Sequence, residues 1–367
     1  MTIDKKIPWW MPQMTGLESD LIKEVIEINY LNEGDYTERL ENEIAQLLGS
    51  KFAVAVTSGT TALFLSLTGS GVGHGDEVIV PDLTFIATAN AVTMTGAKPI
   101  LVDVDPVTLN ISCEAFESAI TPWTKAVIPV HISGRGADMP EIKKIADEHG
   151  LTVIEDAAEA LLSKAHGGYL GTFGKAGCFS FSPNKTITTG QGGLIVTDDE
   201  KLFGRLLELK DQGRPQRGTG GDDIHYSVGY NFKLTNLQAA VGIAQLSALQ
   251  SRVERQKKIY SIYADHLTGL PGITLPGFNI EEGEVPQWTD ALVERRNELD
   301  NYLAERGVSC RRFWYPLHTQ EPYKMDDLTF PDAVRSSSRA LWLPSAFTLT
   351  DDDVATVCRF IHEFVGE

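Results

Sequence analysis

Between residues 52 and 154, short apolar runs alternate with longer segments in which apolar residues recur every three to four positions. The runs are typical of strands buried on both faces, and the longer segments are typical of amphipathic helices. We expect strands over 52–56, 78–80, 100–104, 126–132 and 151–154, and helices over 61–67, 113–120 and 140–149. This alternation predicts an α/β fold with a parallel or mostly parallel sheet.

The remaining chain indicates a second, smaller domain. Further helices are expected over 40–48, 237–267 and 295–306, and from Asp351 onward. A stretch rich in glycine and proline over 270–286 marks a change of organisation between the second and third of these helices. We therefore predict a large domain over 1–250, which includes an N-terminal arm, and a small C-terminal α/β domain over 251–367.

The composition is that of a soluble globular protein, with 42% hydrophobic and 22% charged residues. A formal net charge of -18 argues against a nucleic acid or an anionic membrane as a partner, because both require a positive field. The four cysteines follow no metal-binding or disulfide-framework spacing, so no metal site is expected. Neither a signal-peptide core nor an apolar run of membrane-spanning length is seen, and we expect a cytoplasmic protein.

One lysine is expected on a loop between two strands. Alternation over 178–181 and a β-branched run over 194–196 predict the strands, and Lys185 lies between them. Held between apolar strands and close to three glycines, its amine is expected to be partly shielded from water, which favours the neutral, nucleophilic form. The alternative is a surface lysine in a polar turn, the commoner case for an isolated residue.

Three expected strand ends carry polar or aromatic residues, and ligands of parallel α/β sheets bind beyond such carboxyl ends. The turn 57–61 offers hydroxyls, backbone N–H groups and a helix N-terminus to a phosphate, although plain N-capping by Ser58 or Thr60 explains it as well. Phe85 can stack on a flat ring or belong to the core. Asp156 either receives a cationic partner or caps a helix.

These four features together match the requirements of pyridoxal 5'-phosphate (PLP). The cofactor has a phosphate, a flat ring, a ring nitrogen that must stay protonated to act as an electron sink, and an aldehyde that a lysine captures. Each feature is a weak signal by itself. Their occurrence in one order along the chain makes the combination a specific prediction.

The chain also resembles a known family, the DegT/StrS-type sugar aminotransferases, which are PLP enzymes of the aspartate-aminotransferase fold (fold type I). The motifs that carry the resemblance are TSGTTAL (57–63), PDLTFIATANAV (81–92), PVHISG (129–134), IEDAAEA (154–160), GTFGKAGCFSFSPNKTITTGQGG (171–193), GYNFKLTNLQAAVGIAQL (229–246) and YPLH (315–318). The family implies a large domain with a mostly parallel seven-stranded sheet flanked by helices. Compared with the family, the strand after Trp288 looks shortened, which predicts a reduced sheet in the small domain.

The resemblance also implies roles for single residues. Lys185 resembles the lysine that binds the PLP aldehyde, and Asp156 resembles the partner of the pyridine nitrogen. The full set of implied cofactor contacts is Gly59, Thr60, Phe85, Asp156, Glu159, Ser180, Lys185 and Asn231. Asn231 stands where the family reaches the phosphate of a neighbouring subunit, which implies a homodimer with shared active sites.

Four residues depart from the commonest family pattern, namely Glu159, Gln191, Gln212 and Lys233. Glu159 stands where Gln or His often lies beside the cofactor hydroxyl, and it resembles the Glu of enzymes that make 4-amino-4,6-dideoxy sugars such as perosamine. None of the four removes an implied PLP contact. They leave the substrate, rather than the reaction type, open.

The resemblance implies transamination from L-glutamate to a nucleotide-linked keto-deoxysugar. The acceptor that fits best is a 4-keto-6-deoxyhexose. The amino sugar would be used in a surface polysaccharide or a glycosylated metabolite. Candidates to line the acceptor pocket are Trp9, Trp10, His131, Arg214, Lys233, Arg312 and His318. One alternative is a PLP sugar dehydratase, which carries histidine in place of Lys185. The other is a non-catalytic regulatory protein on the same scaffold, which predicts a lost lysine or a basic DNA-binding segment.

Overall fold

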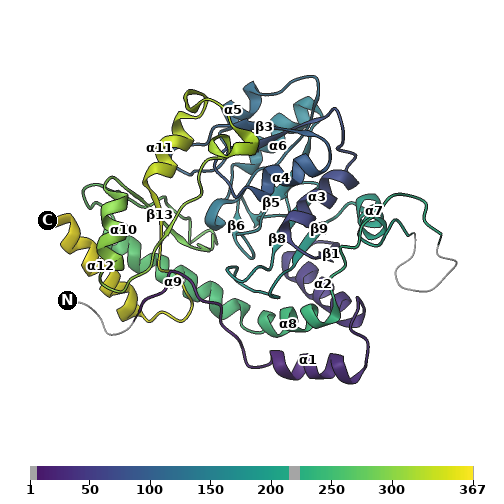
Figure 1. Cartoon of the computed structure of the whole chain (residues 1–367), viewed down its shortest axis with the longest axis horizontal. Helices are drawn as coiled ribbons and strands as arrows, with labels where there is room; N and C mark the ends of the chain where they lie inside the picture. Colours follow the sequence, from purple (N-terminus) through teal and green to yellow (C-terminus); the bar gives the residue numbers. More distant parts are fainter. Residues whose placement is uncertain (1–5, 215–223, 367) are drawn as a thin grey trace.

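The computed structural model describes residues 6–214 and 224–366, and a seven-stranded sheet forms the centre of its larger part (Figure 1). In spatial order, the strands are β1 (Phe52–Val56), β9 (Gly193–Thr197), β8 (Ala176–Ser180), β5 (Thr152–Asp156), β4 (Thr124–Val127), β2 (Glu77–Pro81) and β3 (Lys98–Val102). β9 runs antiparallel to both of its neighbours, and the other pairs are parallel. The predicted mostly parallel sheet is therefore confirmed.

Helices flank this sheet, as expected for strands that are apolar on both faces. They are α1 (Glu18–Glu27), α2 (Asp35–Leu48), α3 (Gly59–Gly69), α4 (Ala87–Met94), α5 (Cys113–Ser118), α6 (Met139–His149), α7 (Glu200–Lys210) and α8 (Asn236–Leu246). All strands and helices predicted between residues 52 and 154 are present, whereas α4 was not predicted. β4 ends earlier than expected, because Pro129 follows it and cannot donate a ladder hydrogen bond.

A four-stranded antiparallel sheet organises the C-terminal part, in the order β10-β11-β13-β12. Its elements are α9 (Leu249–Leu267), β10 (Ile273–Thr274), β11 (Thr289–Val293), α10 (Arg296–Ala304), β12 (Arg311–Arg312), α11 (Pro331–Arg339), β13 (Ala340–Leu343) and α12 (Asp351–Gly366). The strand after Trp288 is β11, and its expected shortening relative to the family stays a prediction. β11 has five residues, as β1 does, and all five are buried.

The amphipathic pattern over 237–267 forms two helices, α8 and α9, rather than the single helix that was expected. Leu249 packs in the core of the larger part, whereas Tyr263 packs in the core of the smaller part. In Figure 1 the two helices follow one another across the lower half of the molecule, with α1 below α8, and connect the two parts. The break between the helices therefore lets each bury its apolar face in a different core.

The N-terminal arm also reaches the smaller part. Ile7 forms a parallel bridge with Val308 and is buried in the same core as Tyr263. Because both the arm and α9 connect the two sheets, the division at residue 250 stays a prediction. A small hairpin, β6 (Lys164–Ala165) and β7 (Gly168–Tyr169), completes the strands.

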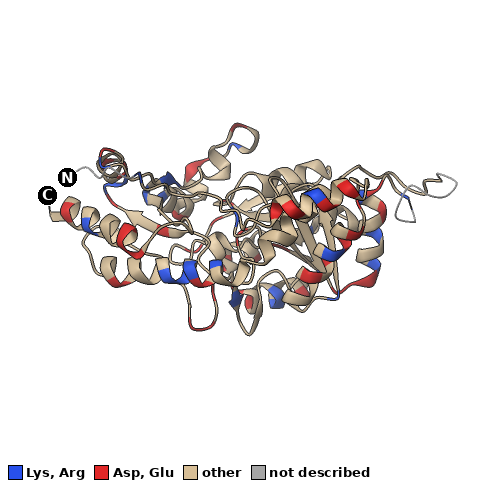
Figure 2. Ribbon diagram, turned by 90° about the horizontal axis from the view of Figure 1, so that it is seen from below, with Lys and Arg blue, Asp and Glu red and all other residues tan. Residues whose placement is uncertain are grey.

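Charged residues of both signs are interspersed along the helices (Figure 2). In this view the acidic residues do not gather in one region, although the net charge is negative. Within residues 6–214 and 224–366, none of the helices combines the length and the hydropathy required to cross a bilayer.

Candidate active site

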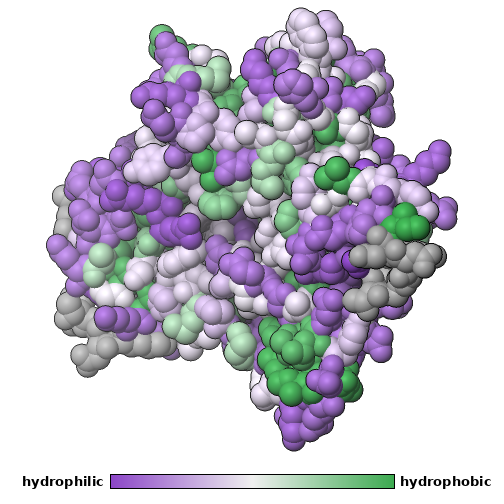
Figure 3. All heavy atoms as spheres, turned by 45° about the vertical axis from the view of Figure 1, so that its right-hand side comes forward, coloured by the Kyte–Doolittle hydropathy of each residue, from purple (hydrophilic) through white to green (hydrophobic). Residues whose placement is uncertain are grey.

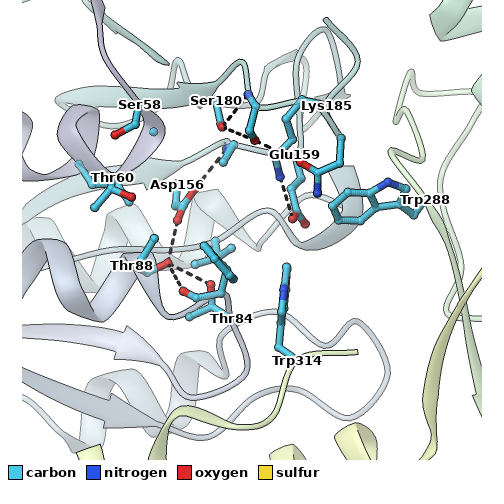
Figure 4. A pocket seen from close by; sticks show the side chains of 18 of the residues that line it. Ser58, Thr60, Thr84, Thr88, Asp156, Glu159, Ser180, Lys185, Trp288 and Trp314 are labelled. Carbon is cyan, nitrogen blue, oxygen red and sulfur yellow. Dashed lines mark hydrogen bonds and ion pairs between the residues drawn. The ribbon is translucent and has the colours of Figure 1, made fainter. Parts of the chain in front are cut away.

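A cavity of about 360 Å³ lies at the carboxyl edge of the seven-stranded sheet, where the C-terminal part of the chain faces it. The start of α3, the β2–α4 loop, the end of β5 and the β8–β9 loop form one side of the cavity. Small-domain residues, including Trp288 and Trp314, form the other side (Figure 4). Most of the sequence-predicted cofactor contacts line it, namely Gly59, Thr60, Phe85, Asp156, Glu159, Ser180 and Lys185.

The N-terminus of α3 forms a cup at one end of the cavity. Ser58 caps the helix through a hydrogen bond from the Thr61 N–H of 3.1 Å, as the N-capping alternative predicted. The N–H groups of Gly59 and Thr60 in the first turn have no partner within the helix, and they add the positive end of its dipole. Capping and anion binding are therefore compatible, because they use different donors.

Two close approaches of the backbone shape the cup. A Cβ atom on Gly59 would lie 3.0 Å from the Cβ of Ser180, which lines the cup from the end of β8. A Cβ atom on Gly193, at the start of β9, would lie 2.3 Å from the carbonyl oxygen of Ser58. These glycines let three backbone segments meet around hydroxyl and N–H donors, an arrangement that fits a phosphate group.

Asp156 lies at the end of β5 and is largely buried. Its Oδ2 accepts a hydrogen bond of 2.8 Å from the Thr88 hydroxyl, and its Oδ1 accepts one of 3.2 Å from the Ala158 N–H. Burial raises the pKa of its carboxyl, an effect that the Thr88 hydrogen bond and the nearby Lys185 amine oppose. A protonated ring nitrogen would give this buried carboxylate a cationic partner.

The amine of Lys185 points into the same cavity and pairs with Glu159, with Nζ 3.1 Å from Oε1 (Figure 4). The Trp288 ring lies beside it, with its centroid 4.9 Å from Nζ. Burial raises the pKa of the Glu159 carboxyl, while Lys185 and the Ser133 N–H lower it. Lys185 was expected to have apolar surroundings. Its Nζ instead has the apolar Trp288 ring as one neighbour and the Glu159 carboxylate as another.

The aromatic side of the cavity is larger than the sequence indicated. Phe85 is 52% exposed and lines the cavity, with its ring 6.3 Å from that of Trp314. Trp288, Trp314 and Trp342 also line it and form one connected aromatic wall. No motif singled out these three tryptophans, because they come from separate segments of the small domain.

The predicted tryptophans Trp9 and Trp10 lie behind this wall rather than in the cavity lining. Trp9 stacks on Trp342 with an interplanar angle of 22°. Trp10 is buried, and its Nε1 donates a hydrogen bond of 3.1 Å to the carbonyl oxygen of Pro183. The arm therefore supports both the wall and the loop that carries Lys185.

The two histidines expected near the acceptor are structural in this arrangement. His131 is fully buried, with Nε2 2.9 Å from the Glu155 carboxylate. His318 is also fully buried, with Nδ1 2.6 Å from the Asp82 carboxylate. Neither residue is part of the cavity lining. His318 instead fixes the chain segment after Trp314 to the end of β2.

The expected cations also lie outside the lining. Lys233 pairs with Asp211, and Arg214 lies 4.0 Å from the same carboxylate. Arg312 pairs with Asp300 at 3.1 Å and faces a neighbouring cavity of about 240 Å³. Its sequence neighbour Arg311 lines the central cavity instead. Successive residues of a strand point to opposite faces, so sequence alone did not decide which arginine faces the site.

Asn231 is exposed and forms a bridge with Asp211, away from the cavity of its own chain. Of the departures from the family pattern, Gln191 lines the cavity, whereas Gln212 does not.

Among the residues that the structure describes, no cluster of three or more His, Cys, Asp and Glu side chains could hold a metal ion.

Comparisons with known proteins agree with this geometry. The chain matches the model described as the DegT/DnrJ/EryC1/StrS aminotransferase family over residues 12–362. GDP-perosamine synthase of Escherichia coli O157:H7 is 38% identical over 368 residues, which cover 99% of this chain and 100% of the relative. The solved structure of DesV from S. venezuelae, in complex with a ketimine intermediate, is 34% identical with a TM-score of 0.91 and covers 95% of this chain and 94% of that chain. A putative sugar aminotransferase from Streptococcus pneumoniae in its PLP-form is 26% identical with a TM-score of 0.92, covering 98% and 100%.

Proposed function

Because the chain belongs to the DegT/DnrJ/EryC1/StrS aminotransferase family and depends on PLP, we propose that it moves an amino group from L-glutamate to a nucleotide-linked 4-keto-6-deoxyhexose. The family assignment confirms the resemblance seen in the motifs and the expected fold type I architecture. The observation that carries the proposal is that Lys185 and Asp156 face one cavity whose far end is a phosphate cup (Figure 4).

The residues present divide the work of holding the cofactor and moving a proton. Gly59, Thr60 and Ser180 hold the phosphate, and Phe85 covers the ring. When bound, PLP supplies a conjugated ring that delocalises the electron pair left on a substrate carbon after deprotonation. Asp156 keeps the ring nitrogen protonated.

Lys185 has two tasks in the proposed reaction. It would hold the cofactor through its aldehyde, and as a free amine its Nζ would move a proton at the substrate carbon. Glu159 accepts a hydrogen bond from this amine and orients it.

The acceptor is proposed to lie against the tryptophan side of the cavity. Trp288, Trp314 and Trp342 present flat apolar surfaces there, which suit the apolar faces and the methyl group of a 6-deoxy sugar. The relative from Escherichia coli is named for a GDP-linked sugar, which supports a nucleotide-linked acceptor. We place the product in the synthesis of a surface polysaccharide or a glycosylated metabolite.

A homodimer with shared sites is part of the proposal. Asn231 is exposed and is not part of the lining of its own cavity, so it is available to a second copy. Figure 3 shows an apolar patch at the lower end of the molecule, where α1 lies in Figure 1. Exposed apolar side chains of α1 and the residues beside it are Leu17, Ile26, Ile28 and Leu31. Such a patch is typical of an interaction surface.

A cytoplasmic location is proposed with it, since the four cysteines are free, as in a reducing compartment.

Covalent trapping tests the central assignment. Borohydride treatment of the PLP-loaded enzyme is expected to fix a pyridoxyl group on Lys185, read by peptide mass spectrometry. The Lys185→Ala variant is expected to bind PLP without this label and to lose at least about 100-fold in turnover. Lys144→Ala, which removes an exposed lysine, serves as the control. Full transaminase activity in Lys185→Ala would contradict the assignment.

The acceptor is identified in a second experiment. The enzyme is loaded as the pyridoxamine form, and nucleotide keto-sugars are screened for return of the aldehyde absorbance. A 4-keto-6-deoxyhexose linked to a nucleoside diphosphate is expected to react fastest. Reaction with a 3-keto sugar alone would rule out the proposed acceptor but leave the reaction type intact.

A further inference from the structure

Among the described residues, the cavity lining contains two basic side chains, Lys185 and Arg311. Lys185 already has a carboxylate partner in Glu159. Within residues 6–214 and 224–366, the guanidinium of Arg311 makes neither an ion pair nor a hydrogen bond. Its charge therefore stays uncompensated beside the site of amino transfer, in a chain with a net charge of -18.

Two indole rings hold this guanidinium in place. The Cζ atom of Arg311 lies 4.9 Å from the centroid of the Trp9 ring and 5.5 Å from that of the Trp342 ring. Aromatic neighbours attract a guanidinium without using its N–H donors. All five donors thus stay available, in a planar group whose geometry matches a carboxylate at two points.

From these contacts we infer that Arg311 binds a carboxylate of the amino donor. The inference rests on the proposed function, which requires an amino acid to place its nitrogen beside Lys185. Asp156 and Glu159 make the cavity unfavourable for a second anion unless a cation compensates it. Arg311 is the residue of the lining that provides this compensation and at the same time selects a carboxylate-bearing donor.

The diphosphate of the sugar nucleotide is the other anion that this chemistry would bind. In the proposed acceptor, the diphosphate is attached across the sugar ring from the keto carbon, so it lies away from Lys185. Arg296 and Arg312 line the neighbouring cavity, which shares Trp314 with the central one. The donor carboxylate, attached one carbon from the reacting nitrogen or at the end of a short side chain, is therefore the better match to Arg311.

Equilibrium binding tests the inference without turnover. Glutarate, an unreactive dicarboxylate, is titrated into the PLP-loaded enzyme while the fluorescence of the neighbouring tryptophans is followed. Arg311→Gln is expected to weaken glutarate binding about 10- to 100-fold, because a charge-assisted bidentate contact is lost. The glutarate affinity of Arg311→Lys is expected to lie between those of the wild type and Arg311→Gln, since lysine keeps the charge but not the planar fork of donors. Arg295→Gln, which removes an exposed arginine outside the cavity, is expected to bind glutarate as the wild type does.

The two half-reactions then separate the two anions. Arg311→Gln is expected to raise the concentration of L-glutamate needed to reach the pyridoxamine form about 10- to 100-fold, and to leave the keto-sugar half-reaction within about twofold of wild type. An equal loss with L-alanine would place the contact at the α-carboxylate, and a loss confined to L-glutamate would place it at the side chain. Unchanged PLP absorbance shows that the variant is folded.

Either of two results would overturn the inference. One is unaltered binding of glutarate and L-glutamate by Arg311→Gln, and the other is a loss confined to a nucleoside diphosphate or the keto-sugar. If the wild-type enzyme itself fails to react with L-glutamate, the proposed donor is wrong. Failure of the proposed donor can be told apart from failure of the Arg311 inference, because the inference is tested only by comparing variants with a wild type that reacts.

Discussion

Two carboxylates three residues apart, Asp156 and Glu159, have different partners and therefore different tasks. Asp156 accepts hydrogen bonds from a hydroxyl and a backbone N–H, which leaves it open to a cationic ring nitrogen. Glu159 is held between the Lys185 amine and the Ser133 N–H, 2.9 Å from its Oε2. Ser133 has a φ of 54°, so its backbone is constrained in the left-handed region to present this donor. Each carboxylate is thus directed to a different atom.

Replacing Asp156 is expected to stabilise the apoprotein while impairing the enzyme. Burial raises the pKa of its carboxyl above the unfolded value, so the native apoprotein retains a proton that the unfolded chain has lost. That contribution to stability is present below the ordinary pKa of aspartate and is lost as the pH rises through the folded pKa. Asp156→Asn does not ionise, and at neutral pH its apoprotein is expected to melt about 2 °C or more above wild type.

The measurement is thermal unfolding of both apoproteins across a pH series, with PLP added in a parallel series. The difference in Tm is expected to vanish in acid, where wild-type Asp156 is protonated. Turnover of the variant is expected to fall about 100-fold or more, because the ring nitrogen loses its anionic partner. A variant apoprotein that is less stable than wild type at neutral pH would show that the carboxylate is not destabilising there.

At the scale of elements, the site depends on where strands end and how closely they approach. β5 and β8 are neighbours and end with Asp156 and Ser180, while β1, which leads to the cup, is separated from β8 by β9. The antiparallel strand β9 begins against the N-terminus of α3, where Gly193 faces the carbonyl of Ser58. β12, with only two residues, directs Arg311 and Arg312 to different cavities.

Gly193→Ala is expected to separate β9 from the start of α3. Its new Cβ would meet backbone atoms of Ser58 and Gly59 rather than a movable side chain. We expect a loss of about 1 to 3 kcal/mol in the free energy of unfolding and weaker PLP binding, read by denaturant titration and by PLP titration. In Gly204→Ala, within α7, the added methyl meets nothing within 4 Å, and a gain of about 0.5 to 1 kcal/mol is expected. Equal stability of the two variants would argue against the close approach.

At the scale of the whole molecule, buried contacts join the seven-stranded and the four-stranded sheets around the cavity. Asp290 of β11 accepts hydrogen bonds from the Ser133 hydroxyl at 2.7 Å and from Arg135 at 2.8 Å. The Trp342 indole donates to the same Ser133 hydroxyl at 3.2 Å. This network connects the aromatic wall to the residue that holds Glu159. The small domain therefore helps to position the lysine side of the site as well as the proposed substrate side.

Subunit mixing tests the proposed dimer. If Asn231 completes the site of its partner, Lys185→Ala mixed with Asn231→Asp yields one intact site in each mixed dimer. Random exchange is then expected to restore about a quarter of wild-type activity per subunit. Mixing Lys185→Ala with Asp156→Asn is the matched control, because both residues belong to one site and no intact site forms. No recovery in the first mixture would contradict sharing through Asn231, and recovery in the control would show that Lys185 and Asp156 do not belong to one site.

The mostly parallel sheet and the residues that line the cofactor side of the cavity could be predicted because their signals are local. Alternation of strands and helices, small residues at a helix start and polar residues at strand ends each occupy a few consecutive positions, as around Gly59 and Asp156. The motif resemblance added the roles of Glu159 and Ser180. These residues reach one cavity because the ends of parallel strands meet at one edge of the sheet.

The substrate side was decided by tertiary structure. Trp288, Trp314 and Trp342 meet only after strands far apart in sequence have paired, and no local pattern marks such a meeting. His131 and His318 looked like ligand residues in sequence, yet buried carboxylates from distant segments accept their hydrogen bonds. Local order along a chain follows from backbone geometry and hydrophobic period, whereas the direction of one side chain depends on neighbours that folding brings from elsewhere.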